Sequence, residues 1–118
     1  MLTLLSLLVL LQAPQVSPQV LGRYECQGEV PTGAYRMNLT VVQDRDNYYF
    51  TWSNAIVQAA KGLGVRVGDH LSVVFVTATN QIGVINYKIG AARLDGTWAM
   101  GGGETFTETC GSGRLDSL

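Results

Sequence analysis

Histidine, acidic pairs and cysteine are the residue types from which this chain could build a catalytic site. His70 is the only histidine in the sequence, and it follows Asp69, a neighbour that could orient an imidazole as a general base. Glu104 and Glu108 could form a carboxylate pair, but an even separation on a strand only places them on one face. We expect both glutamates at the solvated surface and His70 at an exposed turn. Since catalysis needs a nucleophile with a base, paired acids or a metal, the sequence predicts no catalytic residue.

The residue types and spacings in the sequence also argue against metal and nucleotide sites. A closed transition-metal site needs several nitrogen or sulfur ligands, which one histidine and two oxidised cysteines do not supply. The acidic run at 44–47 begins like a calcium loop but lacks the required glycine and the terminal glutamate. The glycine-rich runs at 62–68 and 101–104 lack the spacing, or the following helix, of nucleotide-binding loops. We expect neither a metal nor a cofactor.

Aromatic residues on several predicted strands form the candidate binding site. They are Tyr24, Tyr35, Phe50, Trp52, Tyr87 and Trp98. If these side chains point inward, they could line a pocket at the mouth of a barrel and bind a small apolar or aromatic ligand. Core packing is the alternative, because an eight-stranded barrel is only just wide enough for its own side chains. Trp52 and Trp98 are the most informative members, since a buried indole N–H needs a partner.

Short strands separated by Gly, Asn and Asp are expected to position these residues. The runs with period-two alternation span 22–30, 34–43, 48–53, 56–63, 71–79, 82–89, 93–100 and 104–110. A short helix over 54–61 competes with the fourth run. The fifth run is nearly all apolar, so we expect both of its faces to be covered. The glycines within 62–69 are expected to mark bends, bulges or close approaches of the backbone.

Closure into a barrel follows from the number of strands and from the two cysteines. Neighbouring hairpins are the default connection, and closure removes the two exposed edges of a flat sheet. An even number of strands brings the first and last together antiparallel, so Cys26 and Cys110 can meet across the seam with Cα atoms about 4.4–6.8 Å apart. We predict an all-β antiparallel meander of about eight strands closed into a small barrel, with a β-sandwich as the alternative.

The start of the chain indicates export. Met1 to Leu11 is almost entirely apolar, too short for the roughly 20 residues of a membrane-spanning helix but typical of a signal-peptide core. We predict a signal peptide over 1–19, a β-barrel domain over 20–114 and a C-terminal tail over 115–118. A buried first element and an uncleaved membrane tether are the alternatives. Export to the periplasm or the extracellular medium would allow a disulfide, worth about 4 kcal/mol for so long a loop.

Length and charge limit the partners. The 118 residues allow one domain, and a net charge of −1 provides no basic field for nucleic acid. The chain also lacks a polybasic segment that would hold it on an anionic membrane. After signal removal we expect no membrane span. The remaining partners are a small ligand or an envelope or host protein.

Ordered glycines and aromatics carry a resemblance to a known family. They occur as Gly22-x-Tyr24 with Gly28, Gly33 with Tyr35, Tyr49-x-x-Trp52, Gly62-x-Gly64-x-x-x-Gly68-x-x-Leu71, Gly83-Val84-Ile85-x-Tyr87, Leu94-x-Gly96-x-Trp98 and Gly103-Glu104. Over most of 21–107 this pattern resembles small exported bacterial β-domains of unassigned function, some of them labelled fibronectin-binding protein. The resemblance implies a periplasmic or secreted setting and supplies no catalytic residues. The meander and a Gly-x-Trp element are more loosely similar to avidin-type and lipocalin-type (calycin) barrels.

Three functional hypotheses follow. The first is a non-enzymatic exported binding or structural module that holds a small ligand at the barrel mouth. The second is a surface adhesion or protein-binding domain. The third is an enzyme that uses His70.

Overall fold

The computed structural model describes residues 20–54 and 58–112 of the chain, and this part contains eight β-strands. The strands are β1 (Gly22–Val30), β2 (Gly33–Asp44), β3 (Asn47–Ser53), β4 (Gln58–Val67), β5 (His70–Thr77), β6 (Ile82–Gly90), β7 (Arg93–Ala99) and β8 (Phe106–Ser112). The predicted signal peptide at 1–19 and the predicted tail at 115–118 lie outside the described residues. Among the residues described, no helix has the length and apolar character needed to span a bilayer.

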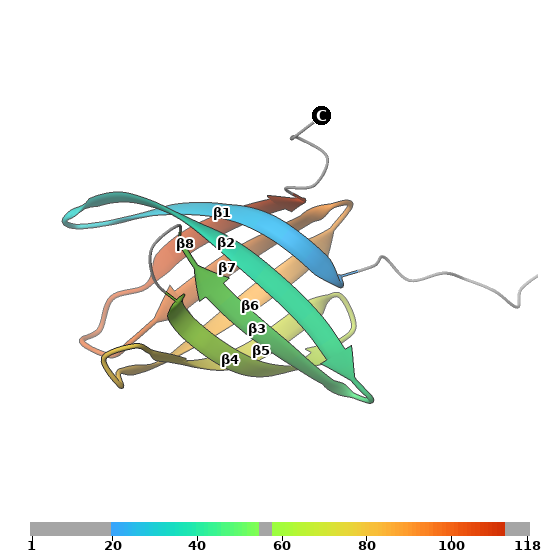
Figure 1. Ribbon diagram of the computed structural model, residues 1–118. Helices are drawn as coiled ribbons and strands as arrows, with labels where there is room; N and C mark the ends of the chain where they lie inside the picture. Colours follow the sequence, from blue (N-terminus) through green and yellow to red (C-terminus); the bar gives the residue numbers. More distant parts are fainter. Residues whose placement is uncertain (1–19, 55–57, 113–118) are drawn as a thin grey trace, which may run out of the picture.

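The strands form one closed antiparallel meander, as predicted. Each strand pairs with its neighbour in sequence, and β1 pairs with β8 to complete the barrel. Figure 1 shows the strands inclined around a common axis, with β1 lying beside β8 at the seam. Closure leaves no free sheet edge among the described strands, which removes the need to protect one from other chains.

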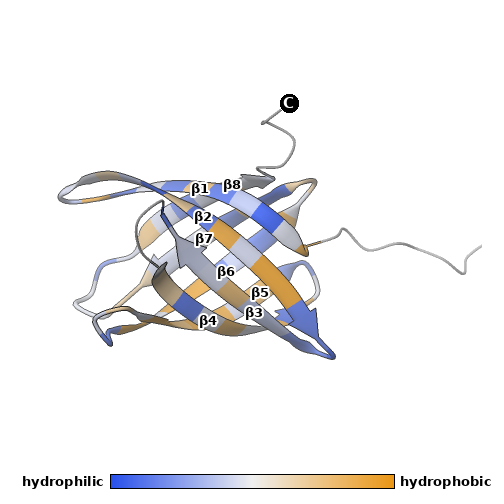
Figure 2. Cartoon of the chain, in the orientation of Figure 1, coloured by the Kyte–Doolittle hydropathy of each residue, from blue (hydrophilic) through white to orange (hydrophobic). Residues whose placement is uncertain are grey.

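Side chains alternate between the interior and the solvent along the strands, because successive residues of a strand point to opposite faces. Polar and apolar segments accordingly alternate along the ribbons in Figure 2. The expectation that both faces of the fifth run are covered is wrong. Within β5, Leu71, Val73 and Phe75 are buried, whereas Val74 and Val76 are 46% and 40% exposed on the outer wall. The outer wall of a closed barrel has no second sheet against it, so even an apolar strand keeps one wet face.

Strand β4 differs from the prediction in its length. It continues as a regular strand through Gly62 and Gly64 to Val67, and the competing helix over 54–61 is wrong because 58–61 belong to the strand. Gly62 and Gly64 mark close approaches rather than bends, whereas Gly68 has a positive φ and lies in the turn after β4, so a bend was predicted correctly there. A Cβ atom at Gly62 would lie 2.9 Å from the ring of Trp52, and one at Gly64 would lie 3.0 Å from the ring of Phe50. The large rings of β3 therefore occupy the space that side chains of β4 would take.

The barrel has two unlike ends. Connections after β1, β3, β5 and β7 lie at one end, here called the open end, and those after β2, β4 and β6 lie at the other, the closed end. Val20, just before β1, is buried and covers the closed end, where the Tyr24 hydroxyl donates a hydrogen bond of 2.9 Å to its carbonyl oxygen. Between β7 and β8, Gly101, Gly102 and Gly103 all have positive φ, so the glycine run does bend the chain.

A disulfide fastens the seam of the barrel. Cys26 of β1 and Cys110 of β8 are directly opposite each other in the ladder and are bonded, as predicted. Their Cα atoms lie 3.9 Å apart, slightly closer than the expected range. Both residues are fully buried, so they point into the barrel. The bridge links positions 84 residues apart and joins the two strands that no hairpin connects.

Candidate functional site

A cavity at the open end of the barrel is the strongest candidate site. Its volume is about 300 Å³, at the lower end of small-molecule sites. Four aromatic side chains line it, together with smaller apolar groups such as Met37, Ala60 and Ile85. Glu108 is the one charged residue in this lining, as far as the structure describes it. We refer to this space as the open-end cavity.

The aromatic walls form a continuous series of ring contacts. Phe75 lies between the two tryptophans, with ring centroids 5.8 Å from Trp52 and 6.2 Å from Trp98. Tyr35 extends the series, 6.3 Å from Trp98. All three contacts are edge-to-face, the arrangement favoured by the ring quadrupoles. These mutual contacts hold the rings in place and keep the cavity walls ordered.

Glu108 is buried, which corrects the expectation that it lies at the solvated surface. It is 5% exposed and belongs to β8, where it shares the inward face with Phe106 and Cys110. Glu104 does lie at the surface, but in the connection before β8 rather than on the strand. The two glutamates therefore do not form a pair.

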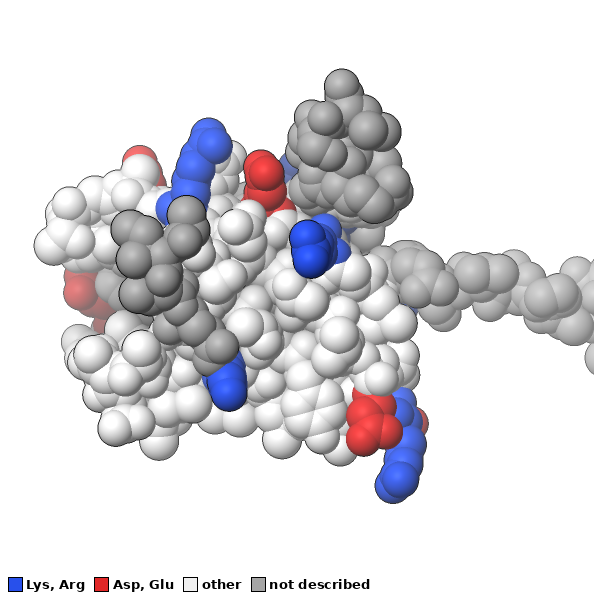
Figure 3. Space-filling model, viewed as in Figure 1, with Lys and Arg blue, Asp and Glu red and all other residues white. Residues whose placement is uncertain are grey.

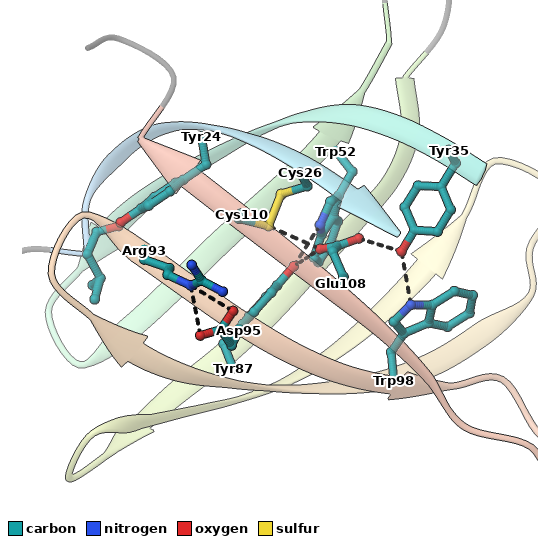
Figure 4. The surroundings of a disulfide bond; sticks show 11 residues. Tyr24, Cys26, Tyr35, Trp52, Tyr87, Arg93, Asp95, Trp98, Glu108 and Cys110 are labelled. Carbon is teal, nitrogen blue, oxygen red and sulfur yellow. Dashed lines mark hydrogen bonds and ion pairs between the residues drawn. A yellow bond between two sulfur atoms is a disulfide. The ribbon is translucent and has the colours of Figure 1, made fainter. Parts of the chain in front are cut away.

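Two hydrogen-bonded arms converge on the carboxyl group of Glu108. In the first, the indole N–H of Trp98 donates to the Tyr35 hydroxyl over 3.0 Å, and that hydroxyl donates to Oε1 of Glu108 over 2.9 Å. In the second, the indole N–H of Trp52 donates to the Tyr87 hydroxyl over 3.0 Å, and that hydroxyl donates to Oε2. Figure 4 shows the two arms meeting at Glu108 beside the disulfide. These five residues are called the Glu108 network below.

Glycines on the neighbouring strands make room for this arrangement. Glu108 is paired with Gly28 of β1 on one side and with Gly96 of β7 on the other. The next strand on each side carries a tyrosine opposite that glycine, Tyr35 on β2 and Tyr87 on β6. A Cβ atom at Gly28 would lie 2.6 Å from the Tyr35 hydroxyl, and one at Gly96 would lie 2.8 Å from the Tyr87 ring. The tyrosines therefore reach Glu108 by crossing over the glycines.

Burial raises the pKa of Glu108 above its usual range, because a charged carboxylate loses hydration inside the barrel. Hydrogen bonds from Tyr87 and Tyr35 oppose this effect by stabilising the ionised form. The pKa values of Tyr35 and Tyr87 are raised as well, first by burial and then by the charge and hydrogen bond of Glu108. Both tyrosines are therefore neutral donors at physiological pH.

The disulfide lies next to this carboxyl group. Sγ of Cys110 is 3.3 Å from Oε2 of Glu108. Glu108 and the two sulfurs are close enough together to suggest a metal cluster. The sulfurs are bonded to each other, however, and do not offer the thiolates that a metal would bind.

The structure places the predicted aromatic residues at three levels in the barrel. Tyr35, Trp52 and Trp98 line the open-end cavity. Phe50 and Tyr87 are buried beneath it, with their rings stacked 6.0 Å apart. Tyr24 lies at the closed end, far along β1 from the mouth. Tyr87 still contributes to the cavity indirectly, because it carries one arm of the Glu108 network.

Sequence reasoning missed Phe75 and Glu108. Phe75 was assigned to an apolar strand and not to the site. For Glu108 the signal was present, because it is two residues from Cys110 and a strand places both on the same face. An inward-facing cysteine therefore implied an inward-facing glutamate.

His70 lies away from the cavity. It begins β5 at the closed end and is exposed. Its Nδ1 is 2.7 Å from the side-chain oxygen of Asn86, and its Nε2 is 3.4 Å from a carboxylate oxygen of Asp69. An exposed hydrogen bond with Asn86 of β6 and the adjacent carboxylate of Asp69 account for these neighbours.

The outer wall carries a row of exposed apolar side chains. One residue from each of β2 to β6 takes part, and each is paired with the next, namely Val42, Tyr49, Leu63, Val74 and Val84. Their exposed fractions run from 41% to 58%. Charges are few and scattered on the face in Figure 3, which has β2, β3 and β4 at the front. We call this set the outer apolar row.

A second hollow lies on the outside of β1, β2 and β8. Its volume is about 520 Å³, and its lining includes the exposed polar side chains of Glu25, Gln27, Arg36 and Asn38. No aromatic ring lines it among the described residues. It therefore lacks the desolvated walls that distinguish the open-end cavity.

No protein-family model matches the chain, and neither a curated protein nor a solved structure is detectably similar to it. The resemblance to small exported bacterial domains therefore stays a prediction. Function is inferred below from the geometry of the barrel.

Proposed function

We propose that this chain is an exported, non-enzymatic domain that binds a small, mainly apolar molecule in the open-end cavity. The observation that carries the proposal is the combination of four aromatic walls with a single buried carboxyl group. Such sites obtain affinity from apolar area and orientation from a few polar groups. The disulfide supports export, since such bonds persist in oxidising compartments.

The construction of the site supports a binding role over simple core packing. A buried carboxyl group loses much hydration, and an apolar residue of similar size avoids that loss. The chain instead keeps Glu108 and surrounds it with two tyrosines, two tryptophans and two glycines that admit the tyrosines. A network of this size holds one carboxyl group in a fixed orientation beside an open space. That is the arrangement expected where a ligand must be recognised.

The two tryptophans provide a direct test, because they are the only tryptophans of the chain and both line the cavity. Titration with N-phenylnaphthylamine, a neutral fluorescent probe, is expected to quench tryptophan emission and enhance probe emission with one stoichiometric site. Ala60→Phe, which places a ring in the cavity, is expected to abolish this signal. Val74→Phe, which adds the same ring to the outer wall, is the matched control and should keep it. Near-ultraviolet circular dichroism checks that both variants remain folded.

Equal probe binding by the wild type and a folded Ala60→Phe variant would contradict the proposal. Binding that is lost in Val74→Phe but kept in Ala60→Phe would place the probe on the outer wall instead.

Protein binding through the outer wall is the second candidate, and the outer apolar row favours it. Exposed apolar side chains that are contiguous across several strands are a common feature of interaction surfaces. Affinity capture from an extract of the producing cells, with wild type compared to Leu63→Asp, tests this candidate. Enrichment of one protein by the wild type but not by the variant would favour it over the cavity.

A further inference from the structure

We propose that the molecule held in the open-end cavity is a small organic cation, an alkyl- or arylammonium, with its positive charge directed at Glu108. This inference rests on the proposed binding function and specifies the class of ligand. It depends on three observations, concerning the donors, the charge and the walls of the cavity.

All of the strong hydrogen-bond donors of the Glu108 network are already used inside it. Both indole N–H groups donate to tyrosine hydroxyls, and both hydroxyls donate to the carboxyl oxygens. Within 20–54 and 58–112, no fully buried side-chain nitrogen or oxygen lacks a partner. The hydroxyl of Thr77, at the rim, is engaged with Thr79 and the backbone of Gln81. What the network still offers a ligand is acceptor capacity, because a carboxylate has more lone pairs than two hydroxyls occupy.

The carboxyl group of Glu108 has no cationic partner among the described residues that line the cavity. Neither lysine, arginine nor histidine contributes to the described lining. Ion pairs elsewhere in the described part of the chain include Arg45 with Asp44 and Arg93 with Asp95, both exposed. A carboxylate held in apolar surroundings gains most from a positive charge, because the attraction is screened least there. A cationic ligand supplies the charge that the protein does not.

The walls are suited to the same kind of ligand. Aromatic rings carry a negative electrostatic potential on their faces and attract cations, with tryptophan the strongest of them. The cavity combines both tryptophans of the chain with Phe75 and Tyr35 around one acid. An anionic ligand would meet the carboxylate and the ring faces, and no buried side-chain donor of the described residues is left unpaired to bind it. A neutral apolar ligand would fit the walls but make no use of Glu108.

A matched pair of probes tests the inference on the unmodified protein. Benzyltrimethylammonium carries a permanent positive charge, and neopentylbenzene has the same shape with carbon in place of nitrogen. Both are titrated against tryptophan emission at about pH 8, where Glu108 is ionised more fully than in acid. The cation is expected to bind roughly tenfold or more tightly than its neutral counterpart.

Two further measurements check the role of Glu108. In Glu108→Gln the preference for the cation is expected to disappear, while the neutral probe still binds. In the wild type, affinity for the cation is expected to fall when the pH is lowered to about 5, and affinity for the neutral probe to stay constant. The titratable groups that face Glu108 in the described structure are Tyr35 from β2 and Tyr87 from β6, and both stay neutral over this range. The acid-dependent loss would therefore report on Glu108.

The possible outcomes separate the inference from the proposed function. If neopentylbenzene binds as tightly as the cation or more tightly, the inference of a cationic ligand is wrong, but the cavity remains a binding site. Failure of both probes, together with failure of N-phenylnaphthylamine, would overturn the binding function itself. If Glu108→Gln does not fold, the pH series and the probe pair on the wild type still decide the question.

Discussion

The closed and open halves of the barrel are built from the same eight strands, yet their interiors differ in kind. The closed half is filled by side chains that are essentially inaccessible, among them Leu39, Val41, Leu71 and Leu94. The open half contains large rings joined by hydrogen bonds around Glu108 and leaves about 300 Å³ unfilled. One half therefore resembles an ordinary protein core, whereas the other resembles the wall of a binding site.

The contrast teaches how a small barrel can be both stable and hollow. A barrel of this size is normally filled by its own side chains. Here aliphatic packing and the buried Val20 stabilise one end, while at the other end rigid rings and fixed hydrogen bonds keep the space open. The disulfide between Cys26 and Cys110 lies one inward position below Glu108 on β8, at the border between the two halves, and fastens β1 to β8 there.

Removal of the disulfide is expected to have the largest effect, because it loosens both halves. Changing Cys26 and Cys110 together to serine should lower the free energy of unfolding by about 4 kcal/mol, as the unfolded chain regains the entropy of a long loop. Chemical denaturation under oxidising conditions measures the loss. Wild type in reductant is the control and should unfold at nearly the same denaturant concentration as the variant. Unchanged stability would mean that the β1–β8 ladder alone holds the seam.

Truncation of buried side chains should destabilise the two halves to different extents, because the halves differ in packing. Leu71→Ala in the closed half is expected to cost about 3 kcal/mol, because it leaves a cavity among fully buried neighbours. Phe75→Leu in the open half is expected to cost only about 1 kcal/mol, because Phe75 already borders open space. The same denaturation experiment compares the two. If Phe75→Leu proved the more costly, the open half would be packed as tightly as the closed half.

The glycines beside Glu108 provide a finer test of the open half. Gly28→Ala is expected to cost about 1–3 kcal/mol and to displace Tyr35, since the added Cβ would lie 2.6 Å from its hydroxyl. Displacement of the Tyr35 hydroxyl should also shift the emission of Trp98, which donates a hydrogen bond to it. Gly111→Ala on β8 is the matched control, because nothing lies within 4 Å of its Cβ position. Equal effects of the two alanines would contradict the role given to Gly28.

Much of the fold could be predicted because it depends on local alternation. Period-two patterning located the strands and their inward faces, and an even number of strands implied that Cys26 and Cys110 meet. The length of β4 was misjudged because Gly62 and Gly64 look like loop residues in isolation. Glycine is required at both positions because the rings of Trp52 and Phe50 on β3 occupy the space that larger side chains would need. A pattern along one strand cannot report the volume of its neighbour.

The site was less accessible to prediction than the fold. Charged residues are rarely fully buried without a partner, so a surface position was the reasonable expectation for Glu108. Its partners come from β2 and β6, each two strands away across a glycine. This proximity depends on the register of four strand pairs and on closure of the barrel. The clue available in the sequence was the parity that Glu108 shares with Cys110.

The pH dependence of stability is the most selective test of the open half. The expected change in the free energy of unfolding per pH unit is the smallest effect among these predictions. Because burial raises the pKa of Glu108, the folded protein holds this proton more tightly than the unfolded chain does. The group therefore stabilises the fold fully below about pH 4.5, and this contribution is lost as the pH rises through the folded-state pKa. The free energy of unfolding cannot change by more than about 1.4 kcal/mol per pH unit when one proton is involved. Glu108→Gln should flatten this decline, whereas Glu25→Gln on the exposed face of β1 should preserve it. Denaturation at fixed pH values between about 4 and 9 measures the stability of the wild type and of both variants. If the stability of the wild type rises over this range and Glu108→Gln does not change the profile, the buried carboxyl group does not govern the open half.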